Sequence, residues 1–241
     1  MKAYIQTNKD GDYYNVNAYI ASVGFKSLGF EVIKYLDAND VLNSEKDVIF
    51  VGGVGMVRRR LANLGIEKQD EIEYPTELRK FLKRKVWKST LKEIIRNDQV
   101  GIFVKPVKTK LFTGKVIRGF KDYIGLNYEE EVEVWCSEVV NVVTEWRCFV
   151  RYNRIVGVRP YKGDWRKHFD YKVVEAIPEA YKNAPNGYAF DVGVTKQGET
   201  LLVEANDGFS LGSYGLFYID YAKLLSARWA ELNGVEDYCN F

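Results

Sequence analysis

Residues 187–207, GYAFDVGVTKQGETLLVEAND, contain two runs with strand-like alternation, YAFDVGVT and TLLVEAN, around a short polar turn. A two-residue turn at Gln197 and Gly198 would set Asp191 directly opposite Glu204. Asn206 follows Glu204 by two residues, so its side chain projects from the same face of the strand. We therefore predict a β-hairpin that carries two facing carboxylates and an amide.

Two carboxylates that face each other on a sheet are destabilising unless a cation lies between them. Oxygen ligands from two carboxylates and one amide suit magnesium, which keeps water or phosphate oxygens as its other ligands. The alternative is a pair of exposed carboxylates at a sheet edge, although apolar neighbours on both runs weigh against it. The pattern by itself leaves both interpretations open.

Composition limits the class of protein. The chain has 241 residues, of which 46% are hydrophobic and 15% aromatic, and this suits a globular protein of one domain or two small ones. Lys and Arg number 35 against 33 Asp and Glu, and a net charge of +2 argues against bulk electrostatic binding of nucleic acid. We find no apolar signal core and no run approaching the ~18 apolar residues of a membrane helix, so we expect a cytoplasmic protein without a membrane partner.

Cysteine and histidine are scarce. Cys136, Cys148 and Cys239 show no metal-binding spacing, so we predict reduced thiols and no zinc site. His168 is the only histidine. No Ser-His or Cys-His catalytic arrangement is evident from the sequence.

Residues 1–75 show a β-α-β-β-α order typical of a small α/β layer. GGVG at 52–55 is similar to a dinucleotide-binding loop, but a tight strand-to-helix turn is the favoured interpretation. Pro75 opens a predicted helix over 76–97, whose segment 79–92 holds seven basic residues and no acidic one. That basic segment is a solvated face, a phosphate contact or a nucleic-acid surface.

Strands are predicted next at 100–107, within 110–140, and in a hairpin that turns at Tyr152 and Asn153. The segment 107–115 follows the strand that carries Lys105, and we expect it to be a mobile lid. The alternative is a plain hairpin in which FTG is part of the turn or of a strand. A last helix is predicted over 218–233.

Several motifs together resemble the ATP-grasp superfamily of carboxylate–amine ligases, in a short-form clade known mainly from sequence. Asp191, Glu204 and Asn206 are similar to its magnesium ligands, and IFVKP at 102–106 resembles the strand whose lysine holds ATP phosphates. CSEVV at 136–140 resembles the adenine-binding hinge, TEWRCFV at 144–150 the strand after it, and RKVWKSTL at 84–91 the helix that supplies an earlier basic ligand.

The resemblance implies an α/β ATP-grasp fold over 76–241, with a nucleotide-binding subdomain at 76–140 and a metal-binding subdomain at 141–241 that sandwich ATP. Residues 1–75 would be a small Rossmann-like preceding domain. The implied cofactors are ATP and Mg²⁺. The lid expected at 107–115 would be mobile without nucleotide and ordered when ATP and magnesium bind. The implied nucleotide-binding residues are Arg84 or Lys85, Lys105, Glu138, Val139, Val140, Glu145 and Arg147, with Lys105 and Arg147 also catalytic.

The implied activity is ligation of a small-molecule or peptide carboxylate to an amine or thiol through an acyl phosphate. Basic side chains at Arg159, Lys162 and Arg166 could contact anions, or could be a solvated loop. The alternatives are a nucleotide-binding ATP-grasp protein without ligase activity and a nucleic-acid-binding protein that uses the basic helix 79–92. The sequence does not define the oligomeric state.

Overall fold

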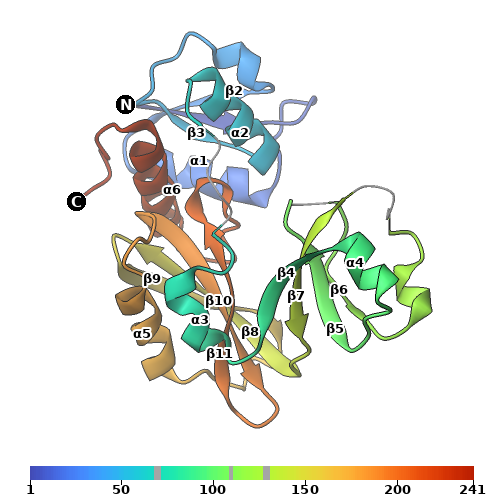
Figure 1. Ribbon diagram of the computed structural model, residues 1–241. Coiled ribbons are helices and arrows are strands. Elements are labelled where there is room, and N and C mark those ends of the chain that lie inside the picture. The colour runs from blue at the N-terminus through green and yellow to red at the C-terminus, as the bar shows by residue number, and fades with distance from the viewer. Residues whose placement is uncertain (68–71, 109–110, 127–130) are drawn as a thin grey trace.

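A computed structural model describes residues 1–67, 72–108, 111–126 and 131–241 (Figure 1). The described strands form one three-stranded and two four-stranded sheets, and helices cover them. The chain therefore has the mixed α/β architecture that the sequence predicts. Two sheets, β4-β7-β5-β6 and β11-β10-β8-β9, face each other across the middle of the molecule.

The three-stranded sheet is parallel, in the order β2-β1-β3. Its elements are β1 (Lys2–Gln6), α1 (Val16–Ser27), β2 (Glu31–Tyr35), η1 (Ala38–Val41), β3 (Ile49–Val51) and α2 (Val54–Asn63). Asn15 caps α1 by accepting a hydrogen bond from the Ala18 N–H at 3.0 Å. Within GGVG, Gly52 and Gly53 form the predicted tight turn between β3 and α2, and the last two residues begin α2.

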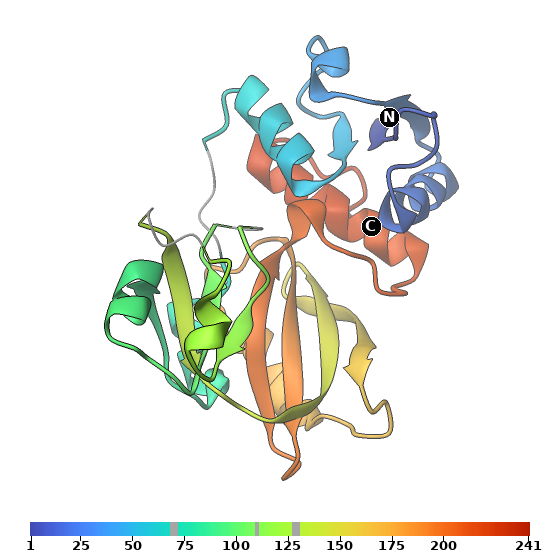
Figure 2. The same ribbon diagram turned by 90° about the vertical axis from the view of Figure 1, so that its right-hand side faces the viewer.

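The core of this layer is completed by the C-terminal helix α6 (Tyr218–Asn233), whose bounds agree with the predicted helix. Figure 2 shows α6 between the three-stranded sheet and the larger antiparallel sheet. Trp229 and Leu225 of α6 share a buried cluster with Phe50 of β3. The Cβ of any residue other than glycine at position 24 would meet the Tyr218 carbonyl oxygen at 2.2 Å, so Gly24 lets α1 and α6 approach closely.

The predicted helix over 76–97 is wrong. The chain forms η2 (Thr76–Leu78), α3 (Arg79–Leu82), β4 (Val86–Thr90) and α4 (Leu91–Arg96). Lys83 ends α3 in the left-handed conformation with φ 47°, and the β-branched and aromatic residues that follow pair with β7. Segment 79–92 is therefore no continuous basic helix, and the nucleic-acid alternative loses the element on which it rested.

The smaller antiparallel sheet has the order β4-β7-β5-β6. Its other elements are β5 (Ile102–Pro106), β6 (Lys115–Ile117), η3 (Phe120–Tyr123) and β7 (Glu133–Glu138). Leu91, Ile94 and Val104 anchor a separate buried cluster beneath it. The expected lid at 107–115 falls partly outside the described residues, since 109–110 are not among them.

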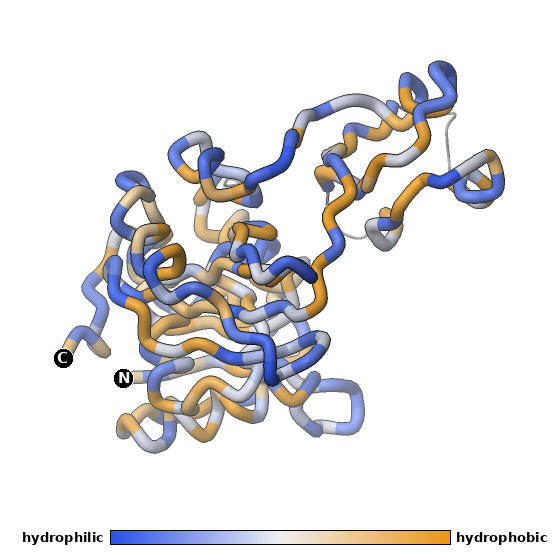
Figure 3. Tube along the Cα trace, turned by 90° about the horizontal axis from the view of Figure 1, so that it is seen from below, coloured by the Kyte–Doolittle hydropathy of each residue, from blue (hydrophilic) through white to orange (hydrophobic). Residues whose placement is uncertain are grey.

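The larger antiparallel sheet has the order β11-β10-β8-β9. Its elements are β8 (Val142–Arg151), β9 (Arg154–Gly163), α5 (Tyr171–Ala180), β10 (Gly187–Thr195), β11 (Thr200–Asp207) and η4 (Gly208–Ser210). Tyr152 and Asn153 form the predicted hairpin turn, both with positive φ. Every residue of β10 is buried, and Figure 3 shows hydrophobic residues along the strands of this part of the molecule.

All three cysteines are free, as the sequence predicts, and the structure shows that all three are buried. Burial raises the pKa of the Cys136 thiol to about 11, so this thiol is poorly nucleophilic near neutral pH. Within the described ranges, no helix combines the length and apolar character needed to cross a membrane.

Candidate functional site

The predicted pairing of Asp191 with Glu204 is confirmed, but through a different turn. Thr195 pairs with Glu199 around a loop of Lys196, Gln197 and Gly198, instead of the expected two-residue turn. Asp191 stands opposite Glu204 while Val192 stands opposite Leu202, so Val203 is the extra residue of a β-bulge. The bulge shifts the register by one residue and brings the two carboxylates together.

Arg147 of β8 stands opposite Asp191 on the other side of β10. Arg147 Nε donates to Asp191 Oδ1 at 2.8 Å and Nη2 donates to Oδ2 at 2.7 Å. Asp191 is 1% exposed and Arg147 is 7% exposed, so this is a buried bidentate ion pair. Burial alone would lower the pKa of Arg147, but the hydrogen bonds and charge of Asp191 outweigh it and raise that pKa.

Two tyrosines cover the Arg147 guanidinium, whose Cζ lies 4.5 Å from the ring centre of Tyr214 and 5.6 Å from that of Tyr161. The Tyr161 hydroxyl donates to Glu145 Oε2 at 2.6 Å and lies 3.3 Å from Asp191 Oδ2. These rings cover the buried ion pair, and Tyr161 also lines the cavity described below.

Lys105 of β5 crosses from the smaller sheet to the larger one. Its Nζ donates to Glu204 Oε2 at 2.6 Å and lies 3.3 Å from Glu73 Oε1. Burial alone would lower the pKa of Lys105, but the charges of Glu204, Tyr74 and Glu73 outweigh it and raise that pKa. Burial would conversely raise the pKa of Glu204, and Lys105 outweighs that effect and lowers it.

The Asn206 amide lies against both carboxylates. Its Nδ2 donates to Asp191 Oδ2 at 3.4 Å, and the side chain is also hydrogen-bonded to Glu204. If the Asn206 amide were flipped, its nitrogen and oxygen would exchange places, and the oxygen would face the two carboxylates. The three predicted metal ligands are therefore together on one face of the β10–β11 hairpin.

A cavity of about 680 Å³ opens between the two antiparallel sheets, a volume typical of sites for small molecules and cofactors. The hinge segment from Ser137 to Val142 lines one end of it, including Glu138, Val139 and Val140. Glu145 and Glu204 line its wall. The predicted adenine and ribose residues and one predicted metal ligand, Glu204, thus line the same cavity. Glu145 already accepts a hydrogen bond from Lys162 at 2.6 Å.

The two candidates for an earlier phosphate ligand differ in position. Arg84 lines the large cavity, and its guanidinium donates to the carbonyl oxygens of Leu202 at 2.7 Å and Val203 at 2.8 Å. Lys85 is exposed, lies over the Trp87 ring at 5.4 Å, and lines a smaller neighbouring cavity instead. Both residues lie in the short bend between α3 and β4, whereas the resemblance implied a helix.

Further predicted anion contacts have internal partners. Arg159 donates to the Gly215 carbonyl at 2.9 Å, and Arg166 is paired with Asp164 at 2.9 Å. Sequence reasoning missed Tyr74, Tyr161 and Tyr214, which touch the charged groups of the site. Only Tyr161 carried a usable signal, because it follows a predicted strand beside basic residues.

The side chains of the hairpin can be compared with the ligands that Mg²⁺ requires. Among residues 1–67, 72–108, 111–126 and 131–241, no three His, Cys, Asp or Glu side chains are arranged to hold a metal ion. The hairpin instead offers two carboxylates and one amide, all oxygen ligands, which leaves positions for phosphate oxygens and water. These residues fit magnesium bound jointly with a nucleotide.

Two antiparallel sheets that close on a nucleotide-sized cavity, with cations and carboxylates paired at one side, define the ATP-grasp class of fold. Similar solved structures include D-alanine–D-alanine ligase from Bacillus anthracis complexed with ATP (TM-score 0.59, 13% identity, 97% of this chain and 98% of that one). The L-amino acid ligase from Bacillus licheniformis is also similar (TM-score 0.58, 9% identity, 96% and 75%). A third is macrocyclase MdnC from Microcystis aeruginosa MRC bound with precursor peptide MdnA (TM-score 0.53, 13% identity, 93% and 99%).

At these identities the similar structures show the fold alone. The model of the ATP-grasp domain, R2K clade family 2, matches residues 81–224, which is more than half of the chain. The protein therefore belongs to this ATP-grasp family, as the motifs indicated. Among curated proteins, no sequence matches it.

Proposed function

We propose that this protein is an ATP-dependent ligase that joins a carboxylate to an amine or a similar nucleophile and releases ADP and phosphate. The observation that supports it best is the set of two ion pairs, Lys105–Glu204 and Arg147–Asp191, beside a cavity of nucleotide size. Phosphoryl transfer depends mainly on positioning and on neutralising phosphate charge, and these groups supply both signs of charge.

The proposed reaction has two steps. A carboxylate oxygen of the substrate attacks the γ-phosphorus, the bond to the β–γ bridging oxygen breaks, and ADP leaves. The amine nitrogen then attacks the acyl carbon, loses a proton, and expels phosphate, which carries away the former carboxylate oxygen. Neither step needs a Ser, Cys or His nucleophile, and this agrees with a single histidine and three buried thiols.

Lys105 and Arg147 would donate to phosphate oxygens and stabilise the charge that develops in the transition state. Asp191, Glu204 and Asn206 would hold Mg²⁺, which neutralises phosphate charge when bound. The hinge backbone at Glu138, Val139 and Val140 would meet adenine, and Glu145 would meet ribose. Arg84 is the better candidate for the earlier phosphate contact, because it lines the same cavity.

The substrates are proposed as a small-molecule or peptide carboxylate and an amine. This rests on the names of the similar ligases, which refer to amino acids and to a precursor peptide. Use of ATP fits the cytoplasmic location that the sequence predicts.

The test measures ADP release from MgATP in the presence of pooled amino acids, polyamines, peptides and sugar acids, followed by mass spectrometry of the products. A carboxylate labelled with ¹⁸O should transfer one labelled oxygen to the released phosphate. Magnesium-dependent nucleotide binding with neither ADP release nor product would favour the nucleotide-binding alternative. Absence of nucleotide binding would contradict the proposal.

A further inference from the structure

Glu73 and Tyr74 precede the two antiparallel sheets in the chain and lie at the charged side of the proposed nucleotide cavity. The backbone N–H of Ala205 donates to the Glu73 carbonyl oxygen at 2.9 Å, so the segment around Glu73 runs along the open edge of β11. This edge contact places the Glu73 and Tyr74 side chains beside Lys105.

Lys105 then has two carboxylate partners, one on each side. Glu204 is at 2.6 Å and Glu73 at 3.3 Å, and the side chains of Lys105, Glu73 and Glu204 are only 12%, 20% and 27% exposed. Glu204 faces Asp191 in the proposed metal site, whereas Glu73 lies outside the β10–β11 hairpin. A cation on Glu204 would therefore leave Glu73 as the carboxylate that holds the lysine.

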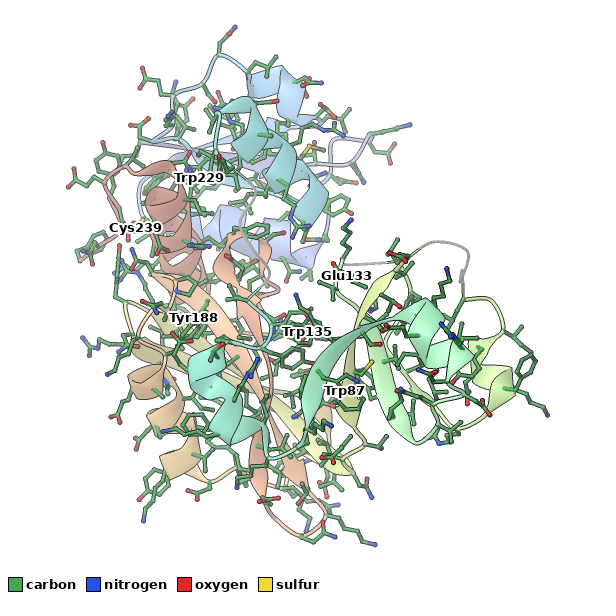
Figure 4. All side chains as sticks on the ribbon, viewed as in Figure 1. Trp87, Glu133, Trp135, Tyr188, Trp229 and Cys239 are labelled. Carbon is green, nitrogen blue, oxygen red and sulfur yellow. The ribbon has the colours of Figure 1, made fainter. Side chains whose placement is uncertain are left out.

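Tyr74 holds the same ammonium from another direction. Its ring centre is 4.7 Å from Lys105 Nζ, and the Lys105 charge opposes the rise that burial causes in the pKa of Tyr74. The ring also packs edge-on against Trp135, with ring centres 4.8 Å apart, and Figure 4 shows Trp135 in the space between the smaller sheet and β10 and β11.

The Tyr74 side chain also separates two cavities. Tyr74 and Arg84 line both the 680 Å³ cavity and a neighbouring one of about 210 Å³ that Lys85 and Trp135 help to line. Removing the ring would join these spaces, whereas removing only the hydroxyl would leave the wall in place.

We propose that Glu73 and Tyr74 are positioning residues that hold the Lys105 ammonium against the nucleotide phosphates. The proposal rests on the proposed function only in taking Lys105 as a phosphate ligand. Glu73 supplies the charge that keeps Lys105 in place when Glu204 serves the metal, and Tyr74 fixes the direction of the lysine. Glu73 and Tyr74, two residues of the segment before β4, thus complete the proposed ATP site.

The test uses the full chain with Glu73→Gln and Tyr74→Phe. Both changes keep the size of the side chain and the backbone bond to Ala205. We expect the dissociation constant for an ATP analogue, measured by calorimetry with magnesium, to rise about tenfold for Glu73→Gln, which corresponds to about 1.4 kcal/mol. Tyr74→Phe should raise it less, because the ring contact remains.

A second readout reports on Lys105 itself without any turnover. Glu73 Oε1 lies 3.3 Å from Lys105 Nζ, so loss of this carboxylate should leave the lysine side chain less firmly held and more accessible to a reagent. Acetylation of Lys105 by an amine-reactive ester at pH 9, followed by mass spectrometry, should then be several-fold faster in Glu73→Gln. Glu199→Gln is the matched control, since it breaks the more exposed Lys83–Glu199 pair at 3.1 Å and should change neither readout.

Two outcomes overturn the proposal. Wild-type nucleotide affinity in both Glu73→Gln and Tyr74→Phe contradicts it, whatever the labelling rate, since the two residues would then be merely structural. Lys105→Ala separates this failure from that of the proposed function. If Lys105→Ala also binds the analogue normally, the phosphate role of Lys105 is wrong, and the positioning proposal is overturned with it.

Discussion

The Glu204 carboxylate contacts the Lys105 ammonium at 2.6 Å. It also stands opposite Asp191, with which it is proposed to bind the metal ion. Glu204→Gln keeps the shape and removes the charge that both the lysine and the metal ion need. We expect turnover to fall by about 10² or more, because a group that stabilises transition-state charge typically contributes that much. Thermal unfolding would show whether the fold is intact, and unchanged turnover would exclude Glu204 from the metal site.

The same residue predicts a pH dependence of stability. Lys105 lowers the pKa of Glu204 in the folded protein, against the effect of burial. Since the unfolded-state pKa is the higher one, this contribution is complete at neutral pH and is lost as the pH falls through about 4.3 toward the folded-state pKa. The free energy of unfolding in urea should therefore drop more steeply between pH 6 and pH 3 for the wild type than for Glu204→Gln. Parallel curves would show that Glu204 is not stabilised by Lys105.

Arg147 is expected to affect stability as well as chemistry. Removing it leaves Asp191, which is 1% exposed, without its bidentate partner. Arg147→Ala should cost about 3 to 5 kcal/mol in the free energy of unfolding, measured with urea at pH 7. The double variant Arg147→Met with Asp191→Leu should regain most of that stability while remaining inactive, since neither charge is then buried alone. Equal stability of Arg147→Ala and the wild type would contradict a structural contribution from the pair.

At the scale of the elements, the sequence correctly predicts those helices, turns and strands that depend on residues close together in the chain. The helix at 218–233, the turn at Tyr152 and Asn153, and the strand that carries Lys105 are all present. The helix over 76–97 failed because pairing of β4 with β7 outweighed the run of good helix formers. Capping of α4 by Thr90 and Glu93 shows that a helix start was encoded there, fifteen residues later than predicted from Pro75.

From residue spacing alone, the site was predicted only where its residues lie on one hairpin, and its other residues were named only through the family resemblance. Asp191, Glu204 and Asn206 come from adjacent strands, so alternation sufficed to place them on one face, although the turn and the bulge at Val203 were both missed. Tyr74 and Tyr214 reach the site through contacts between distant segments. Periodicity contains no information about such contacts, so no local pattern could have revealed them.

A substitution at Gly198 tests the three-residue turn that joins β10 to β11. Gly198 has φ 85° and no atom would meet an added Cβ within 4 Å, so Gly198→Ala acts only through backbone conformation. We expect a loss of about 1 to 2 kcal/mol in the free energy of unfolding. Gly55→Ala on α2 is the matched control, because the same open space lies in a helix, where alanine should stabilise by about 0.5 to 1 kcal/mol. Losses of equal size at both positions would show that the left-handed turn is not the cause.

At the scale of the whole molecule, the N-terminal layer shares one core with α6 and one face of the larger antiparallel sheet. Trp229 of α6 is 2% exposed, packs against Phe50 of β3, and donates to the Lys46 carbonyl oxygen at 3.0 Å. Ser213 donates to Asn17 Oδ1 from its backbone N–H at 2.9 Å, in the loop that carries Tyr214. The layer therefore supports both α6 and the loop over Arg147, and a preceding Rossmann-like domain at 1–75 stays a prediction.

The shared core gives the last prediction, that a fragment of residues 1–67 does not fold by itself. A chain of this size buries too little apolar surface to be more than marginally stable, and here α6 covers the cluster that contains Phe25, Phe50 and Val51. We expect no cooperative urea transition by circular dichroism for the fragment. In the full chain, Trp229→Ala should cost about 3 to 5 kcal/mol, as for other buried aromatic side chains. A cooperative transition in the fragment would instead show that the N-terminal layer is an independent domain to which α6 is only appended.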